Sequence, residues 1–196
     1  MAGTKRKSEE LEIINRQQLI YQLDRIENPK HKALIAFIYL TGARISEVLG
    51  MKKTFMDGRN IIIEPLTKES IEVLPEQDLV LVHNVACLKR KTNLPRRNIP
   101  IIMSQETPII DIFLLYHNSL IPGSPLFDIS RQHAWRIVNK NLGSYTHFLI
   151  HTRCTHLVTK KGFTDTDLMR FRGWKNTLMA STYTHLNYMD IANKMR

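Results

Sequence analysis

The first quarter of the chain carries apolar side chains at helical spacing. They recur every three to four positions over residues 11–26, which predicts an amphipathic helix there. The Asn-Pro dipeptide at 28–29 breaks the pattern, and a second helix is expected over about 30–40, with Gly42 well placed to end it. A short third helix is expected over about 44–51.

The middle of the chain has a different pattern. Dense β-branched residues, separated by turn formers, predict short strands at residues 61–64, 70–73 and 79–83. A further strand is expected over 98–103. The segment 89–97 between the last two strands reads KRKTNLPRR, which predicts a hairpin with a basic turn.

The helical period returns from about residue 107. Later helices are expected near 130–140, 147–161, 164–171, 176–182 and 188–195. The sequence contains no internal repeat and no obvious second domain. The predicted fold class is therefore mixed, mainly α with a small antiparallel β-sheet, in one domain over 11–196 that follows a flexible tail at 1–10.

Charge and cysteine content narrow the functional classes. The formal net charge is +10 and the pI is about 9.8, which favours a polyanionic partner such as nucleic acid. The two cysteines, Cys87 and Cys154, are too few for a disulfide framework or a cysteine metal cluster. The N-terminus has no signal-peptide pattern, and the longest apolar run, 33–40, is too short to span a bilayer.

Four short motifs then follow one another along the chain. They are Thr41-Gly42-Ala43-Arg44-Ile45-Ser46-Glu47, Lys91-Thr92, His147-Phe148-Leu149-Ile150-His151-Thr152, and Gly173-Trp174 followed by Tyr183-Thr184-His185-Leu186. In this order they resemble the catalytic domain of the tyrosine recombinases, or phage integrases, and the likeness covers nearly the whole chain. Tyr183 lies nine positions after Trp174, which is the usual family spacing.

The resemblance implies site-specific DNA recombination or integration, with Tyr183 as the nucleophile. Attack on a DNA phosphodiester would give a covalent 3′-phosphotyrosine, which a free 5′-hydroxyl then attacks, so no metal, ATP or other cofactor is expected. The expected partner is double-stranded DNA, bound by a tetramer that is monomeric in free solution. The expected location is the cytoplasm of a prokaryotic cell, in association with the nucleoid. Details of the motifs also resemble integrases of archaea and their viruses.

The resemblance also assigns roles around the tyrosine. Arg44 would clamp the phosphate, and Lys91 at the hairpin tip would protonate the leaving 5′ oxygen, with Lys89 as its alternative. His147 would accept the tyrosine proton or hydrogen-bond the phosphate. Trp174 would donate its indole N–H to a phosphate oxygen and pack beside the tyrosine.

Some positions are assigned less directly. Tyr188 is the alternative nucleophile, and His151 matches a family position that more often serves packing and hydrogen bonding. Nonspecific phosphate contacts are expected from basic residues in and around the hairpin turn and in the last third of the chain. These are Lys89, Arg90, Arg96, Arg97, Arg153 and Arg172.

One position departs from the family pattern. Ile150 stands three positions after His147, where relatives carry a second phosphate-binding arginine. Losing one preorganised donor costs about 10²–10³ in rate, so this chain is expected to cleave poorly unless another arginine substitutes. Arg153 and Arg172 are the candidates, and a local misalignment is the remaining explanation. If cleavage is impaired, Ile150→Arg is expected to raise its rate.

Other functions compete with recombination. A non-catalytic DNA-binding module on the same fold is one alternative, to which Ile150 gives weight. A topoisomerase that relaxes DNA with similar tyrosine chemistry is another. Full-length relatives carry an N-terminal core-binding domain on the other DNA face, and that domain is not expected in this sequence.

Overall fold

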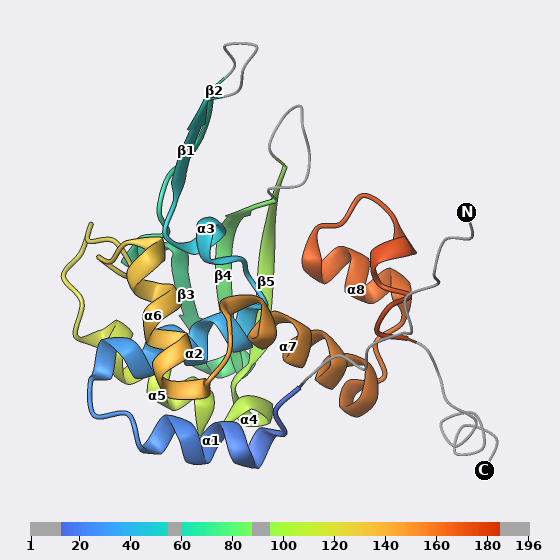
Figure 1. The fold of residues 1–196 in the computed structure, drawn as a ribbon, viewed down its shortest axis with the longest axis horizontal. Coiled ribbons are helices and arrows are strands. Elements are labelled where there is room, and N and C mark those ends of the chain that lie inside the picture. Colours follow the sequence, from blue (N-terminus) through green and yellow to red (C-terminus); the bar gives the residue numbers. More distant parts are fainter. Residues whose placement is uncertain (1–12, 55–59, 88–94, 185–196) are drawn as a thin grey trace, which may run out of the picture.

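A computed structural model describes residues 13–54, 60–87 and 95–184 (Figure 1). The predicted tail at 1–10 and the predicted helix at 188–195 lie outside these ranges. The described residues form a mainly α structure with two small antiparallel sheets, so the predicted fold class is confirmed. No described helix has the length and apolar character needed to cross a membrane.

Helix α2 (Pro29–Thr41) forms the centre of the molecule (Figure 1). Asn28 caps its first turn by accepting a hydrogen bond from the backbone N–H of His31, and Gly42 ends it with a positive φ of 57°. Residues 33–41 are all buried, which is typical of a helix enclosed on every side. The helices packed around it are α1 (Arg16–Asp24), α5 (Ile109–Asn118), α6 (Arg131–Leu142) and α7 (Thr146–Lys161).

The main sheet lies beside this helical core. Its order is β3 (Ile71–Leu74), β4 (Leu79–Ala86) and β5 (Arg96–Ile102), all antiparallel. The β4–β5 pair is the predicted hairpin, and its register is interrupted by a bulge between Val82 and Val85. Residues of β5 alternate between buried and exposed, as expected for a strand with one face on the core.

The strand predicted at 61–64 is present, but its partner strand was not predicted. The third helix, α3, covers only Ile45–Val48, and β1 (Met51–Thr54) then pairs with β2 (Asn60–Ile63). Gly50 separates α3 from β1 with a φ of 73°, and a Cβ there would lie 2.6 Å from the carbonyl oxygen of Ile63. The glycine therefore lets the chain leave the helix and approach β2 closely.

The last part of the chain brings the remaining motifs toward the sheet. Helix α8 (Asp165–Arg172) begins at a Thr164 capping box and ends at Gly173. The helix predicted over 176–182 is instead a short 3₁₀ turn, Thr177–Met179, followed by the turn that carries Tyr183. The short helix α4 (Met103–Glu106) was not predicted, and it connects β5 to α5.

Candidate active site

Arg44 is held at the start of α3 by a carboxylate. It is the N-cap residue of that helix, and its backbone N–H donates to Oε2 of Glu47 at 2.9 Å. Its guanidinium also pairs with Oε1 of Glu47 at 2.7 Å, and the Arg44 side chain remains 14% exposed. The arginine is thus fixed in direction while still reaching solvent.

Glu47 is fully buried and joins Arg44 to a second arginine. Arg97 donates from Nη2 to Oε2 of Glu47 at 3.1 Å and from Nη1 to the carbonyl oxygen of Ala86 at 3.4 Å. Burial alone would raise the pKa of Glu47, but Arg97, Arg172 and Arg44 outweigh it and lower that pKa. Glu47 is therefore an ionised carboxylate at the centre of an arginine cluster.

Arg97 does not lie on the open basic turn where the sequence analysis placed it. It is only 9% exposed, because it shares the inward face of β5 with Ile99 and Ile101. Its neighbour Arg96 faces outward and donates to the carbonyl oxygen of Asn84 at 3.0 Å. Arg96 therefore remains available for outside contacts, and Arg97 belongs to the buried cluster.

Helix α7 supplies two histidines one turn apart. The ring centroids of His147 and His151 are 5.7 Å apart, as expected for positions i and i+4. His147 is exposed, whereas Nδ1 of His151 lies 2.6 Å from the hydroxyl oxygen of Tyr183. Ile150, on the same helix, is 2% exposed within the hydrophobic core.

Tyr183 packs on the tryptophan predicted to neighbour it. The two rings are stacked, with centroids 6.0 Å apart and planes inclined by 14°. Trp174 is 6% exposed, and its indole N–H has no hydrogen-bond partner among the described residues. The expected packing of Trp174 beside Tyr183 is therefore confirmed.

The electrostatics of the tyrosine combine opposing effects. Burial raises the pKa of the Tyr183 phenol, and the Cys154 sulfur adds to that effect. Arg172 and Arg44 act in the opposite direction because they stabilise the phenolate, but burial outweighs them and the pKa of Tyr183 stays above its ordinary value. Burial, followed by the charge of Arg172, lowers the pKa of His151, so this histidine is neutral at pH 7 and can accept a proton.

Arg172 is buried inside this group of residues. It is 1% exposed, and its guanidinium carbon lies 5.6 Å from the centroid of the Trp174 ring. Burial and the nearby charges of Arg97 and Arg44 lower its pKa to about 10, so it remains a cation at neutral pH. Arg172 therefore lies within the cluster, not on an outer surface as expected for a nonspecific phosphate contact.

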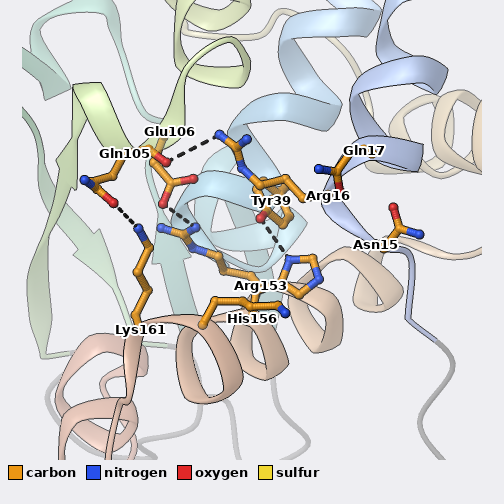
Figure 2. Close-up of a pocket in the computed structure, with 10 residues that line it drawn as sticks. Asn15, Arg16, Gln17, Tyr39, Gln105, Glu106, Arg153, His156 and Lys161 are labelled. Carbon is orange, nitrogen blue, oxygen red and sulfur yellow. Dashed lines mark hydrogen bonds and ion pairs between the residues drawn. The ribbon is translucent and has the colours of Figure 1, made fainter.

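Arg153 lies on another side of α7, in a separate pocket of about 540 Å³ (Figure 2). Its Nη1 pairs with Oε1 of the buried Glu106 at 2.8 Å, and its guanidinium carbon lies 5.3 Å from the Tyr39 ring centroid. In the same pocket, Nδ1 of His156 lies 3.0 Å from the Tyr39 hydroxyl. Arg153 is therefore occupied by a structural ion pair and does not face Tyr183.

Several predicted residues fall outside the described ranges. They include Lys89, Arg90 and Lys91, which the sequence predicts to lie in a hairpin turn, and the alternative nucleophile Tyr188. Within the described residues, no group of three or more histidine, cysteine, aspartate or glutamate side chains is placed to hold a metal ion. The groups that meet are thus arginines, histidines and aromatic side chains.

Two features of the site were not identified from sequence. The spacing of Glu47, three positions after Arg44, is that of a helix capping pair, but nothing in the sequence indicated that this carboxylate also binds Arg97. The contact of His151 with Tyr183 had no local signal, because the two residues lie 32 positions apart. Alternation with Ile99 and Ile101 would have identified Arg97 as inward-facing.

Comparison with known proteins identifies one family and similar solved structures. A model described as the phage integrase family matches residues 13–189. No curated protein sequence matches the chain significantly. The fold resembles XerH site-specific recombinase bound to difH substrate, with a TM-score of 0.61 and 15% identity over 94% of this chain and 53% of that chain.

Two further solved structures are similar. The catalytic domain of bacteriophage HP1 integrase has a TM-score of 0.57 and 19% identity, over 95% of this chain and 94% of that domain. The Tn1549 transposon integrase in complex with transposon right end DNA has a TM-score of 0.58 and 19% identity, over 95% of this chain and 66% of that one. The chain thus spans about half of XerH and nearly all of the HP1 catalytic domain.

Proposed function

Because the chain belongs to the phage integrase family, the family of tyrosine recombinases, we propose that it breaks and rejoins duplex DNA in site-specific recombination or integration. The observation that carries the proposal is the environment of Tyr183. Its hydroxyl contacts a neutral histidine at 2.6 Å, its ring stacks on Trp174, and the charges of Arg44 and Arg172 favour its phenolate. This combination suits a phenol that must lose a proton while an anion is bound beside it.

In the proposed reaction, the Tyr183 oxygen forms a bond to the phosphorus of one DNA strand. The bond from phosphorus to the 5′ oxygen breaks, which leaves a 3′-phosphotyrosine, and the tyrosine proton passes to Nδ1 of His151. Arg44 donates to the non-bridging oxygens, on which negative charge increases in the transition state. A 5′-hydroxyl then attacks the phosphotyrosine and restores both the phosphodiester and the phenol.

Other groups complete the proposal. His147, exposed one helical turn from His151, would hydrogen-bond a phosphate oxygen, and the indole of Trp174 would do the same once a phosphate lies against it. Lys91, with Lys89 as its alternative, would protonate the leaving oxygen. Arg96 and Arg90 would contact the DNA backbone without reading its sequence.

The proposed partner is double-stranded DNA, bound by a homotetramer that dissociates in free solution. The XerH and Tn1549 integrase structures were solved with DNA, and their folds match this chain over most of its length. The net charge of +10 supports a DNA partner. The proposed location is the prokaryotic nucleoid.

The direct test is capture of the covalent product. The full chain is incubated with libraries of nicked duplexes, from which a short strand diffuses away after cleavage so that rejoining is prevented. We expect a protein–DNA band that resists denaturation, with one 3′ phosphate linked to the protein and a defined sequence around it. No covalent product with any duplex would refute the cleavage proposal.

Ile150 favours a second candidate, a DNA-binding module that does not cleave. An isoleucine cannot donate to a phosphate oxygen, and this side chain is buried in the core. Such a module would retard duplex DNA in a salt-dependent manner and form no covalent band. The same capture experiment, read beside a DNA-binding measurement, therefore separates the two candidates.

The pH dependence of cleavage tests the role of His151. Because the pKa of His151 is lowered, its neutral form persists below the usual histidine range, and a fall in rate is expected only below about pH 6.5. The measurement is the single-turnover cleavage rate at subsaturating DNA between pH 5 and 8, corrected for bound DNA. His151→Gln is expected to lower the rate by about 10²–10⁴ and to remove the fall in rate at low pH. If the rate fell with a midpoint at or above the usual histidine pKa, or if the same fall remained in His151→Gln, the assignment of His151 would be contradicted.

A further inference from the structure

Arg172 carries a free-energy cost that the fold does not explain. It is the largest fully buried side chain among the described residues, and its Nε and Nη1 atoms have no hydrogen-bond partner among them. Arg97 and Arg153 are also buried, but each pairs with a carboxylate, at 3.1 Å and 2.8 Å. The nearby Glu47 carboxylate stabilises the charge of Arg172, but the Nε and Nη1 groups stay unsatisfied. Buried unsatisfied polar groups are costly, and they are concentrated at functional sites.

Arg172 lies close both to the turn that leads into Arg44 and to the ring of Trp174. Its Nη1 lies 3.4 Å from the point that a Cβ on Gly42 would occupy, so the guanidinium rests against the turn that leads into Arg44. On another side, its guanidinium carbon lies 5.6 Å from the ring centroid of Trp174, which stacks on Tyr183. Arg172 is therefore placed between the phosphate-clamping arginine and the nucleophile.

Neither Ile150 nor Arg153 can bind the phosphate as a second arginine. Ile150 is apolar and belongs to the hydrophobic core. Arg153 is committed to Glu106 in the separate pocket. Arg172 has unpaired N–H donors, a positive charge and a place beside Arg44 and Trp174.

We propose that Arg172, at the C-terminal end of α8, is the second phosphate-binding arginine of this site and takes the role that Ile150 cannot perform. The inference rests on the proposed cleavage function. Its N–H groups would donate to a non-bridging oxygen of the scissile phosphate as charge develops there. Tyr183 is half-buried and stacks on the Trp174 ring that the Arg172 guanidinium contacts, so a phosphate bound at the Tyr183 hydroxyl would lie near this guanidinium.

The test compares Arg172→Met with Arg170→Met in the full chain, on a nicked duplex that the unmodified protein cleaves. Arg170 is exposed on the same helix and serves as the matched control. We expect Arg172→Met to lower single-turnover cleavage by about 10²–10³, as for loss of one preorganised donor, and Arg170→Met to leave it unchanged. Because a methionine fills similar volume without a charge, the melting temperature of Arg172→Met is expected to be unchanged or raised.

A second substrate separates a phosphate contact from a structural role. In a methylphosphonate, a methyl group replaces one non-bridging oxygen and removes its charge. Cleavage of this substrate therefore depends less on a cation that stabilises that charge. The deficit of Arg172→Met is expected to shrink at least about tenfold on this substrate, whereas a general packing defect would lower both rates equally. An equal deficit on both substrates, or cleavage within a few-fold of the unmodified protein, overturns the inference.

Arg172→Lys provides a second test in case the methionine variant does not fold. A lysine keeps the charge but not the planar donor set, so we expect a folded protein that cleaves at least about tenfold more slowly. Loss of fold in both Arg172 variants would assign the residue to the structure and overturn the inference. If the unmodified protein forms no covalent product, the cleavage proposal itself fails, and that result is distinct from an active protein that does not need Arg172.

Ile150→Arg provides an independent check. Because Arg172 already supplies the second arginine, this substitution is expected to leave the cleavage rate unchanged or lower. The sequence alone had predicted an increase. The measurement is the same single-turnover rate, accompanied by a thermal melt because the new charge would enter the core. A rate above that of the unmodified protein would mean that the site lacked an arginine, and it would overturn the assignment of Arg172.

Discussion

Tyr183→Phe is expected to abolish the covalent protein–DNA product while leaving the fold and DNA binding close to those of the unmodified protein. The variant keeps the ring that stacks on Trp174 and loses only the hydroxyl that contacts His151. Stability should therefore change by about 1 kcal/mol, the usual value for one hydrogen bond. Removing a nucleophile is far more costly for the reaction, at least about 10⁴-fold in rate.

The measurement is a denaturing gel of labelled nicked duplex after incubation with protein, beside a native gel for binding. Tyr145→Phe is the matched control, because Tyr145 is exposed, lies close enough to influence the charge of Tyr183, and is not proposed to react. A covalent band that survives in Tyr183→Phe would exclude Tyr183 as the nucleophile. The alternative, Tyr188, would then be tested by the same substitution.

Glu47→Ala is expected to destabilise the protein by about 3–5 kcal/mol, the range measured when one partner of a buried ion pair is removed. Glu47 is fully buried between Arg44 and Arg97, and without it Arg97 loses its carboxylate partner. For a chain of this length, each kcal/mol corresponds to about 2–4 °C in melting temperature. Cleavage should fall as well, because Arg44 loses both of its contacts with this carboxylate.

Thermal and urea unfolding measure this effect. Glu72→Ala is the control, since Glu72 forms a partly exposed pair with His83 and should contribute less than about 1 kcal/mol. The pKa of Glu47 is lowered on folding, so its contribution is complete above the ordinary glutamate pKa of about 4.3 and is lost as pH falls through the lower, folded value. Equal melting temperatures for Glu47→Ala and the control would show that the arginine cluster does not depend on this carboxylate.

Much of the fold follows from local patterns. The enclosed helix α2 was predicted from its apolar run and its glycine end, and the Asn-Pro pair that was predicted to end the preceding pattern also begins this helix. The β4–β5 hairpin followed from two β-branched segments around a turn. Strand β1 and its pairing with β2 were missed because Lys52 and Lys53 give β1 little apolar alternation, whereas the β2 segment was predicted as a strand.

The candidate site was predictable in part. The motifs predicted Arg44, Trp174 and Tyr183 as site residues, and the structure brings the last two into stacking contact. The burial of Arg172 and the contact of His151 with Tyr183 depend on how α7 and α8 pack, and no local pattern specifies that packing. Charged residues are usually expected at the surface, which is why Arg97 and Arg172 were first interpreted as surface contacts.

The alternation of β5 has a consequence for the accuracy of the site. A shift of this strand by one residue would turn Ile99 and Ile101 to solvent and bring Asn98 and Pro100 inward, which the core would strongly disfavour. Arg97 shares the inward face of the same strand, so the position of its guanidinium is set by apolar packing several residues away. The cationic side of the site is thus positioned as accurately as the close-packed interior of the protein.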